Sequence, residues 1–256
     1  SITAEGWGAL STDMGNGDVY LEANNCDVKV IKSGYGTYAD GMGCKVVVND
    51  SKMDIATYMG IIAGDGQTTY NNVNGISGQN CIMMHTVALE INQIGIFNAN
   101  GGKITTKDDF VLVKSTNADI TLDGVNATAQ NGVLIHSIVN DDAKAPKVNG
   151  QKVPGYKATL KNMTVAGDII HEDPDRGMSV ALFSTILKGA IKDASVSLDS
   201  SSKWTATADS KVTLIGNIDV KTIDAQAGVK ITAAAGGGCN LQGVYKLASG
   251  GELNIK

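Results

Sequence analysis

Short runs in which apolar and polar residues alternate recur along the whole chain. Alternation is the pattern of a strand with one buried and one exposed face, because successive side chains point to opposite sides. Most runs are followed by Asn, Asp or Gly, which tolerate the left-handed backbone of a sharp corner. Clear examples are 18–22, 27–32, 103–106, 118–123, 157–161, 194–199, 211–215 and 229–233. The pattern predicts an all-β fold, with one short helical segment expected at 186–194.

One strand–turn–strand phrase returns several times. The clearest pair begins at Gly36 and Gly95, and looser copies begin at Gly8, Gly60 and Gly132. A unit of this size cannot bury its apolar face alone, so the copies are expected to stack as a solenoid. Coils of about two dozen residues predict roughly ten to twelve coils. At about 4.8 Å per coil the rod is on the order of 50 Å long.

Stacked coils imply that each strand pairs in parallel with its equivalent in the next coil. Parallel crossovers are overwhelmingly right-handed, so we predict a single-stranded right-handed parallel β-helix (β-solenoid) with projecting loops. A β-sandwich is the alternative, and it would show two-residue Asn-Gly hairpin turns. We expect one domain over 1–256, with the irregular loops in about 1–190 and more regular coils in about 191–256.

Aligning the copies on their first glycine predicts which side chains fill the interior. The third position is apolar in every copy, being occupied by Leu10, Tyr38, Ile62, Phe97 and Leu134. Tyr38 is therefore expected inside the coil, as part of an aromatic ladder. The same alignment places Asp40 and His136 in one lengthwise row, with Gly64 between them. That row is too sparse to define a catalytic pair.

Three segments interrupt the coil pattern, at 66–79, 140–156 and 171–178. The second and third contain all the prolines, Pro146, Pro154 and Pro174. Proline cannot donate to a sheet ladder, so these segments are predicted to be loops outside the coils. Loops of this kind commonly line the binding face of a solenoid.

Composition narrows the classes of function. Charged residues make up 18% of the chain, the net charge is −5, and Arg176 is the single arginine. Nucleic-acid binders need clustered Lys and Arg, so nucleic acid is excluded as a partner. No stretch approaches the roughly 20 apolar residues of a membrane span. We therefore expect neither nucleic-acid binding nor a membrane span.

Metal and cofactor chemistry finds no support in the sequence. The cysteines form no Cys-x-x-Cys pair and are expected to pack as small apolar side chains. They are Cys26, Cys44, Cys81 and Cys239. The segment 13–18 has oxygen donors at alternate positions but lacks the spacing and closing Glu of an EF-hand. We predict no metal and no cofactor.

The histidines and acidic residues supply candidate catalytic chemistry. His85 and His136 lie in apolar strand runs, where an imidazole is more often a hydrogen-bonded structural group. The segment 171–176 combines an imidazole, three carboxylates and the arginine. A histidine there can act as general base while the arginine holds a carboxylate or sugar oxygen. If the protein is an enzyme, the candidate catalytic residues are His171, Asp173 and Arg176; a solvated charged turn is the alternative.

Candidate ligand-binding residues are tyrosines and carboxylates of the loop-bearing part. Exposed aromatic rings can stack on sugar rings, whereas buried ones would only fill a coil. The acidic pairs Asp108–Asp109 and Asp141–Asp142 are not dyads by themselves, because neighbours on a strand point to opposite faces. The predicted ligand-binding set is Tyr35, Asp40, Tyr58, Tyr70, Asp141 and Asp142.

Two stretches carry a resemblance to a known group of proteins. Gly34-Tyr-Gly-Thr-Tyr-Ala-Asp-Gly41 is similar to the Gly-x-Tyr-Gly-Ile-Tyr-Ala-x-Gly coil starts of autotransporter passenger domains. The stretch 196–214, with Trp204, a Thr-rich strand and Asp-Ser, resembles their C-terminal coils. The chain thus resembles adhesin-like bacterial cell-surface β-helix proteins, which implies the fold and a secreted or cell-surface location. It implies no catalytic residues.

The resemblance has two departures, since we identify no signal peptide and no translocator barrel after Lys256. Under it we expect a processed part of an exported protein, or another export route. The leading hypothesis is a surface module that binds glycans or partner proteins. A second is a carbohydrate-active enzyme (polysaccharide lyase, glycoside hydrolase or isomerase) on a pectin-lyase-like β-helix. A third is a self-assembling fibre subunit, forming end-to-end or side-by-side homo-oligomers through unpaired strand edges.

Overall fold

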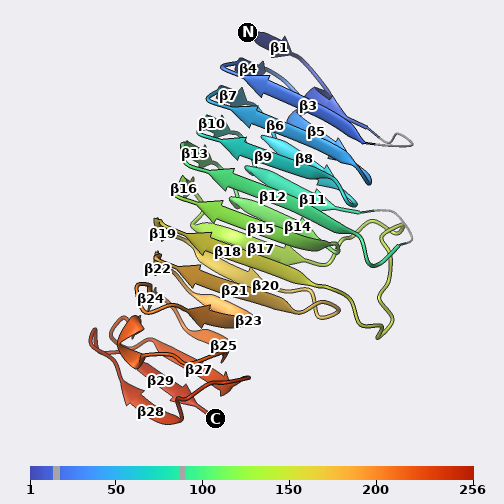
Figure 1. Ribbon diagram of the computed structural model, residues 1–256. Coiled ribbons are helices and arrows are strands. Elements are labelled where there is room, and N and C mark those ends of the chain that lie inside the picture. Colours follow the sequence, from blue (N-terminus) through green and yellow to red (C-terminus); the bar gives the residue numbers. More distant parts are fainter. Residues whose placement is uncertain (14–17, 87–89) are drawn as a thin grey trace.

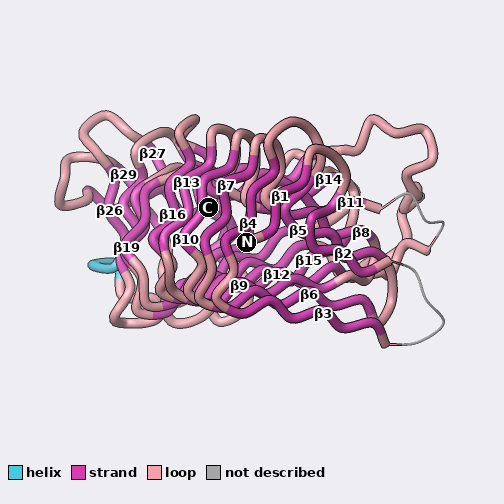
Figure 2. Tube along the Cα trace, turned by 90° about the horizontal axis from the view of Figure 1, so that it is seen from above, coloured by secondary structure: helices cyan, strands magenta, loops and turns pink. Residues whose placement is uncertain are grey.

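The chain folds as a parallel β-helix in which successive coils lie directly over one another (Figure 1). The structure is a computed structural model that describes residues 1–13, 18–86 and 90–256. Equivalent strands pair in parallel with matched register, as where Ile2 lies beside Val28 and Val28 beside Met53. Seen from above, equivalent strands of successive coils run alongside one another, each offset from the one before (Figure 2). The predicted fold class is confirmed.

Three rows of strands form the walls. The first row contains β1 (Ile2–Ala4), β4 (Asp27–Val30), β7 (Lys52–Ile55), β10 (Asn74–Ser77), β13 (Lys103–Thr106) and β16 (Asn126–Ala129), and continues after a break as β19 (Thr164–Ala166), β22 (Ile186–Lys188), β24 (Lys203–Ala206) and β26 (Ile223–Ala225). The second row contains β2 (Gly8–Thr12), β5 (Tyr35–Asp40), β8 (Gly60–Ala63), β11 (Ile82–His85), β14 (Val111–Lys114), β17 (Val133–Ile138) and β20 (Asp168–His171). The third row contains β3 (Val19–Asn24), β6 (Cys44–Asn49), β9 (Gln67–Asn71), β12 (Ile94–Asn100), β15 (Asn117–Asp123), β18 (Tyr156–Lys161) and β21 (Met178–Phe183).

The second and third rows merge near the C-terminal end. The strand β23 (Ile191–Leu198) pairs with β20 through Ile191 and with β21 through Ser195. Below it, β25 (Ser210–Leu214), β27 (Lys230–Ala235) and β29 (Glu252–Ile255) continue the merged row in parallel. A short 3₁₀ helix, η1 (Val220–Thr222), precedes β26. The last coils therefore have two strands instead of three.

The two ends of the stack differ. Among the described residues, β1, β2 and β3 each pair on one side only, with β4, β5 and β6. At the other end, β28 (Gly243–Lys246) runs antiparallel beside β29. This reversed strand is an exception to the parallel pattern and forms the outer edge of the merged row.

The interior is filled by apolar side chains from all three rows. Leu10, Ile62 and Leu134 are buried, which confirms this part of the predicted core. Phe97 is fully buried, and its ring meets that of Tyr70 edge-on with centroids 5.5 Å apart. Two of the cysteines, Cys44 and Cys81, are also fully buried in the interior, whereas Cys26 and Cys239 are partly exposed.

A left-handed residue turns the chain from the third row into the first row of the next coil. Its φ lies between 47° and 63° in seven coils, where it is Asn25, Asp50, Asn72, Gly101, Gly124, Asn162 and Ser184. The preceding residue contributes to an asparagine ladder, since Asn71 Nδ2 donates to Asn49 Oδ1 at 2.7 Å and Asn49 Nδ2 to Asn24 Oδ1 at 2.7 Å. Asn and Gly recur at these corners because they tolerate this backbone.

Two predictions of local structure are wrong. The segment 66–79 is part of the coils, because it contains β9 and β10, and the buried side chains of Tyr70 and Val73 hold it inside. The segment 186–194 forms β22 and the start of β23 rather than a helical turn. The other predicted loops are confirmed, since 139–155 and 172–177 lie outside the strands. The first of these projects beyond the strands (Figure 1).

The predicted alignment of the copies is also wrong in part. The copy beginning at Gly95 lies in β12, in the third row, whereas the other copies lie in the second row. Tyr38 pairs with Ile61 and points outward, so it is no part of an interior ladder. Asp40 pairs with Ala63, and His136 pairs with Leu112, so the two are not in one lengthwise row. Similar glycine-rich phrases open strands of different rows.

Two adjacent glycines at one corner allow two costs of adding a side chain to be measured separately: backbone strain, and steric overlap with a neighbouring coil. Gly101 has a φ of 63° and open space around its Cβ position, whereas a Cβ on Gly102 (φ 75°) would overlap the Val73 carbonyl. We expect Gly101→Ala to lower the free energy of unfolding by about 1–2 kcal/mol through backbone strain alone. Gly102→Ala is expected to cost about 3 kcal/mol, because overpacking is added. Urea denaturation measures the free energy of unfolding of both variants. Equal losses in the two would contradict the expected overlap with the Val73 carbonyl.

Candidate ligand-binding site

Four aromatic rings gather at the corner between the first and second rows in the N-terminal coils. Trp7 precedes β2, Tyr35 and Tyr38 lie in β5, and Tyr58 precedes β8. The Tyr35 ring centroid lies 6.0 Å from that of Trp7, 5.9 Å from Tyr38 and 6.2 Å from Tyr58. Trp7 and Tyr38 are themselves 5.9 Å apart. We call these four residues the aromatic patch.

The aromatic patch faces solvent. The Trp7 side chain is 66% exposed, and the three tyrosines are partly exposed. Single exposed aromatic residues are common on protein surfaces, but a contiguous exposed apolar patch marks an interaction site. Three rings in mutual contact, with a fourth, Tyr58, beside Tyr35, therefore distinguish this corner as a candidate binding surface.

Coil stacking holds the rings in place. Tyr35 and Tyr58 occupy equivalent positions of consecutive coils, because Thr37 pairs with Gly60 in the ladder. The backbone of Trp7 is left-handed, with a φ of 56°, which is uncommon for a bulky residue. Its carbonyl accepts a hydrogen bond of 2.7 Å from the Tyr35 N–H. Left-handed backbone at a large residue is a strained arrangement that often accompanies ligand contact.

A carboxylate lies at the rim of the aromatic patch. The Tyr38 hydroxyl donates a hydrogen bond of 3.0 Å to Asp40 Oδ2. Burial raises the pKa of Tyr38 far above its ordinary value, and the charges of Asp40 and Asp13 raise it further. Tyr38 therefore stays a neutral donor, and the rim carries negative charge. Asp40 makes no ion pair with any Lys or Arg in the described part of the chain.

The structure brings together some of the predicted ligand-binding residues. Tyr35, Tyr58 and Asp40 lie at or beside the aromatic patch. Tyr70 is misassigned, because it is 1% exposed and its hydroxyl donates to the Met59 carbonyl at 3.1 Å inside the coil. Sequence reasoning missed Trp7, although its position beside the repeated Gly8 was a usable signal. It missed Tyr38 because the copies were aligned on their first glycine, whereas in the structure Gly8 pairs with Tyr35 rather than Gly36.

The predicted residues Asp141 and Asp142 lie at a polar pocket of about 310 Å³ farther along the rod. Lys114 Nζ and Asp141 Oδ1 form an ion pair of 3.2 Å there. Burial lowers the pKa of His85, so its imidazole is neutral at neutral pH. Asp40 pairs with Ala63, which pairs with His85, so the pocket begins two coils from Asp40. The pocket is lined by Met83, His85, Lys114, Asn140, Asp141 and Asp142.

The predicted catalytic residues form a closed network instead of an open site. Asp173 and Arg176 are 1% and 3% exposed, and Arg176 Nη1 lies 3.0 Å from Asp173 Oδ2. The Tyr156 hydroxyl donates to the same oxygen. His171 Nδ1 and Ser137 Oγ share a hydrogen bond of 2.6 Å. Burial lowers the pKa of His171. Neither the open catalytic group nor the solvated turn expected from the sequence describes this segment.

A second histidine joins two carboxylates on the outer face. His136 Nδ1 lies 3.0 Å from Asp109 Oδ2, and its Nε2 lies 3.3 Å from Glu172 Oε2. Asn131 Nδ2 donates to the other Asp109 oxygen at 2.6 Å. The pKa of His136 is raised, chiefly by the hydrogen bond to Asp109, although burial acts to lower it. Sequence reasoning missed this group because its residues come from three different coils.

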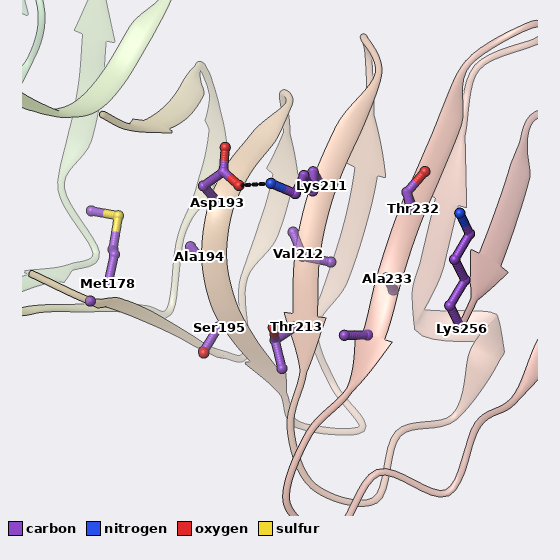
Figure 3. A pocket seen from close by; sticks show the side chains of 12 residues that line it. Met178, Asp193, Ala194, Ser195, Lys211, Val212, Thr213, Thr232, Ala233 and Lys256 are labelled. Carbon is purple, nitrogen blue, oxygen red and sulfur yellow. Dashed lines mark hydrogen bonds and ion pairs between the residues drawn. The ribbon is translucent and has the colours of Figure 1, made fainter. Parts of the chain in front are cut away.

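A further hollow lies where the second and third rows merge (Figure 3). Its volume is about 430 Å³, and Ala194, Val212 and Ala233 lie along its floor. At its edge Lys211 Nζ forms an ion pair of 2.6 Å with Asp193 Oδ1. Small side chains and the irregular register at this junction leave the space open. None of the residues predicted from the sequence lies in it.

In the described part of the chain, no group of three or more His, Cys, Asp or Glu side chains is arranged to hold a metal ion. The weak calcium candidate at 13–18 falls largely on 14–17, outside the described residues. None of the described helices is long and apolar enough to cross a membrane.

No protein-family model, curated protein or solved structure matches this chain. The resemblance to adhesin-like surface proteins and passenger domains therefore stays a prediction.

The group around His136 predicts a pH dependence of stability. The pKa of His136 is raised above its ordinary value of 6.5 in the folded protein. Its stabilising contribution is therefore fully present below the unfolded-state pKa and is lost as pH rises through the higher folded-state pKa. Between about pH 5.5 and about pH 8.5, we expect the wild type to lose more unfolding free energy than His136→Asn.

Urea denaturation across this pH range measures the difference between the two proteins. His85 and His171 are present in both, so their contributions cancel. Asp109→Asn is expected to remove most of this pH dependence, because Glu172 remains beside His136, whereas the neighbouring Asp108→Asn retains all of it. Identical pH profiles for the wild type and His136→Asn would contradict the assigned charge interaction.

Proposed function

We propose that this protein is an exported bacterial surface β-solenoid that binds glycans through the aromatic patch. The observation that carries the proposal is the clustering of one exposed and three partly exposed aromatic rings at one corner of the rod. A binding surface, rather than a catalytic centre, is the best-supported assignment because two of the predicted catalytic residues, Asp173 and Arg176, are buried against each other. The cell-surface location belongs to the proposal and is supported by the resemblance of the coil phrases.

The chemistry of the aromatic patch suits a sugar. A pyranose ring has an apolar face of C–H groups, which packs on an aromatic face, and an edge of hydroxyl groups. The tyrosine hydroxyls and the Asp40 carboxylate provide donors and acceptors beside the rings. Aromatic residues with a polar tip are suited to contacts of this mixed kind. The same corner thus offers stacking and hydrogen bonding together.

The rigid coil supports a role in adhesion. The rings are attached to neighbouring coils whose backbones are hydrogen-bonded to one another, as in the bond from Gly36 N–H to the Tyr58 carbonyl at 3.3 Å. Such a surface loses little conformational entropy on binding, because its side chains are already held in place. Several copies on a cell would add avidity to weak individual contacts.

Removing single rings tests the proposal. A glycan array identifies a ligand for the wild type, and titration calorimetry then compares variants with that ligand. We expect Trp7→Ala and Tyr35→Ala each to weaken binding by about 1–2 kcal/mol, or roughly five- to thirtyfold. Tyr20→Ala is the matched control, since Tyr20 is 59% exposed on β3 but lies outside the aromatic patch. An array without any bound glycan would contradict the proposal.

A further inference from the structure

The surroundings of the aromatic patch are acidic. Asp40 is hydrogen-bonded to Tyr38, and the charge of Asp13 acts on the same tyrosine. The nearby Lys32 is already neutralised by Glu5, with Nζ and Oε2 2.6 Å apart. Residues 1–186 contain 20 acidic and 13 basic side chains, whereas 187–256 contain 6 and 8. The aromatic patch therefore lies in the negative part of the rod.

A negative rim around aromatic faces favours a positively charged ligand. The face of an aromatic ring carries a negative quadrupole and attracts an ammonium group, with Trp the strongest of the rings. Asp40 adds a full negative charge that no Lys or Arg of the described chain pairs. An anionic glycan would instead meet repulsion at this rim. Stacking alone would accept many glycans, and charge complementarity favours the positively charged ones among them.

We infer that the aromatic patch prefers glycans with free amino groups, such as chains of 2-amino-2-deoxy sugars. This inference rests on the proposed glycan-binding function. The C–H face of the sugar stacks on Trp7 and Tyr35, while its ammonium group faces Asp40. Acetylation of the amine removes the positive charge and with it the attraction to the rings and the carboxylate. The degree of acetylation is therefore the property that this surface distinguishes.

The acidic surface continues along the axis of the rod. The polar pocket with Asp141 and Asp142 begins two coils from Asp40, or about 9.6 Å at the spacing of paired strands. Lys114 pairs with Asp141, which leaves Asp142 as a further negative charge at the pocket. A longer amino-sugar chain that lies along the rod can reach both places. Affinity is therefore expected to rise with chain length.

Matched oligosaccharides test the inference. Titration calorimetry at about pH 6, where the sugar amine is protonated, compares a glucosamine oligomer with an N-acetylglucosamine oligomer of equal length. We expect the wild type to bind the free-amine oligomer at least tenfold more tightly. In Asp40→Asn the preference falls to threefold or less, because the variant loses more affinity for the free-amine oligomer than for the acetylated one. Trp7→Ala is expected to weaken both interactions.

The control is Asp27→Asn, which removes an exposed carboxylate of the first row and is expected to keep the full preference. Circular dichroism confirms that each variant folds. Equal affinity for both oligomers, or binding of a neutral glycan alone, would overturn the inference and leave the proposed function intact. Binding of no glycan by the wild type would overturn both. Binding of oligolysine but of neither oligomer would assign the aromatic patch to a basic peptide and overturn the inference.

Discussion

Parallel hydrogen bonding from each coil to the next is the constraint on which the rest of this molecule depends. A coil presents its interior to its neighbours and has no other means of burying it, so strands must repeat at matched register along the rod. This repetition aligns the side chains as well. It places the asparagine amides of β3, β6 and β9 at hydrogen-bonding distance, and it places Tyr35 and Tyr58 on consecutive coils. The asparagine ladder and the aromatic patch, both on the outside of the rod, have the same cause.

The corners control where variation is possible. Left-handed residues keep the path from the third row to the first row short and uniform over seven coils. The connections between the other rows are less constrained, and there the chain inserts the loop 139–155 and the turn 172–177. The aromatic patch, the polar pocket and the group around His136 all lie along the second row. The candidate sites thus lie along the side of the rod where the connections between strands are least uniform.

Burial decides what a polar group can do in this fold. Asp173 and Arg176 have the side chains of an active site, but both are closed to solvent and form an ion pair with each other. A buried pair of this kind is retained because breaking it leaves an uncompensated charge. Asp40 carries the same chemical group as Asp173 at a partly exposed position, without a cationic partner in the described chain. Its charge is therefore available to a ligand.

The sequence by itself determined the class of fold, since the period of two, the glycine and asparagine corners and the repeated phrase all indicate stacked coils. It also identified buried positions such as Leu10, and Tyr35 and Tyr58 as candidate contacts. Only the tertiary structure decided which row each strand joins, because the phrases at Gly60 and Gly95 look alike but open strands of different rows. A strand shifted by one residue presents its opposite face. That is why Tyr38 points outward although the alignment of the glycines places it inside. His136 and Asp109 lie in different coils, so they could be assigned to one site only from their neighbours in space.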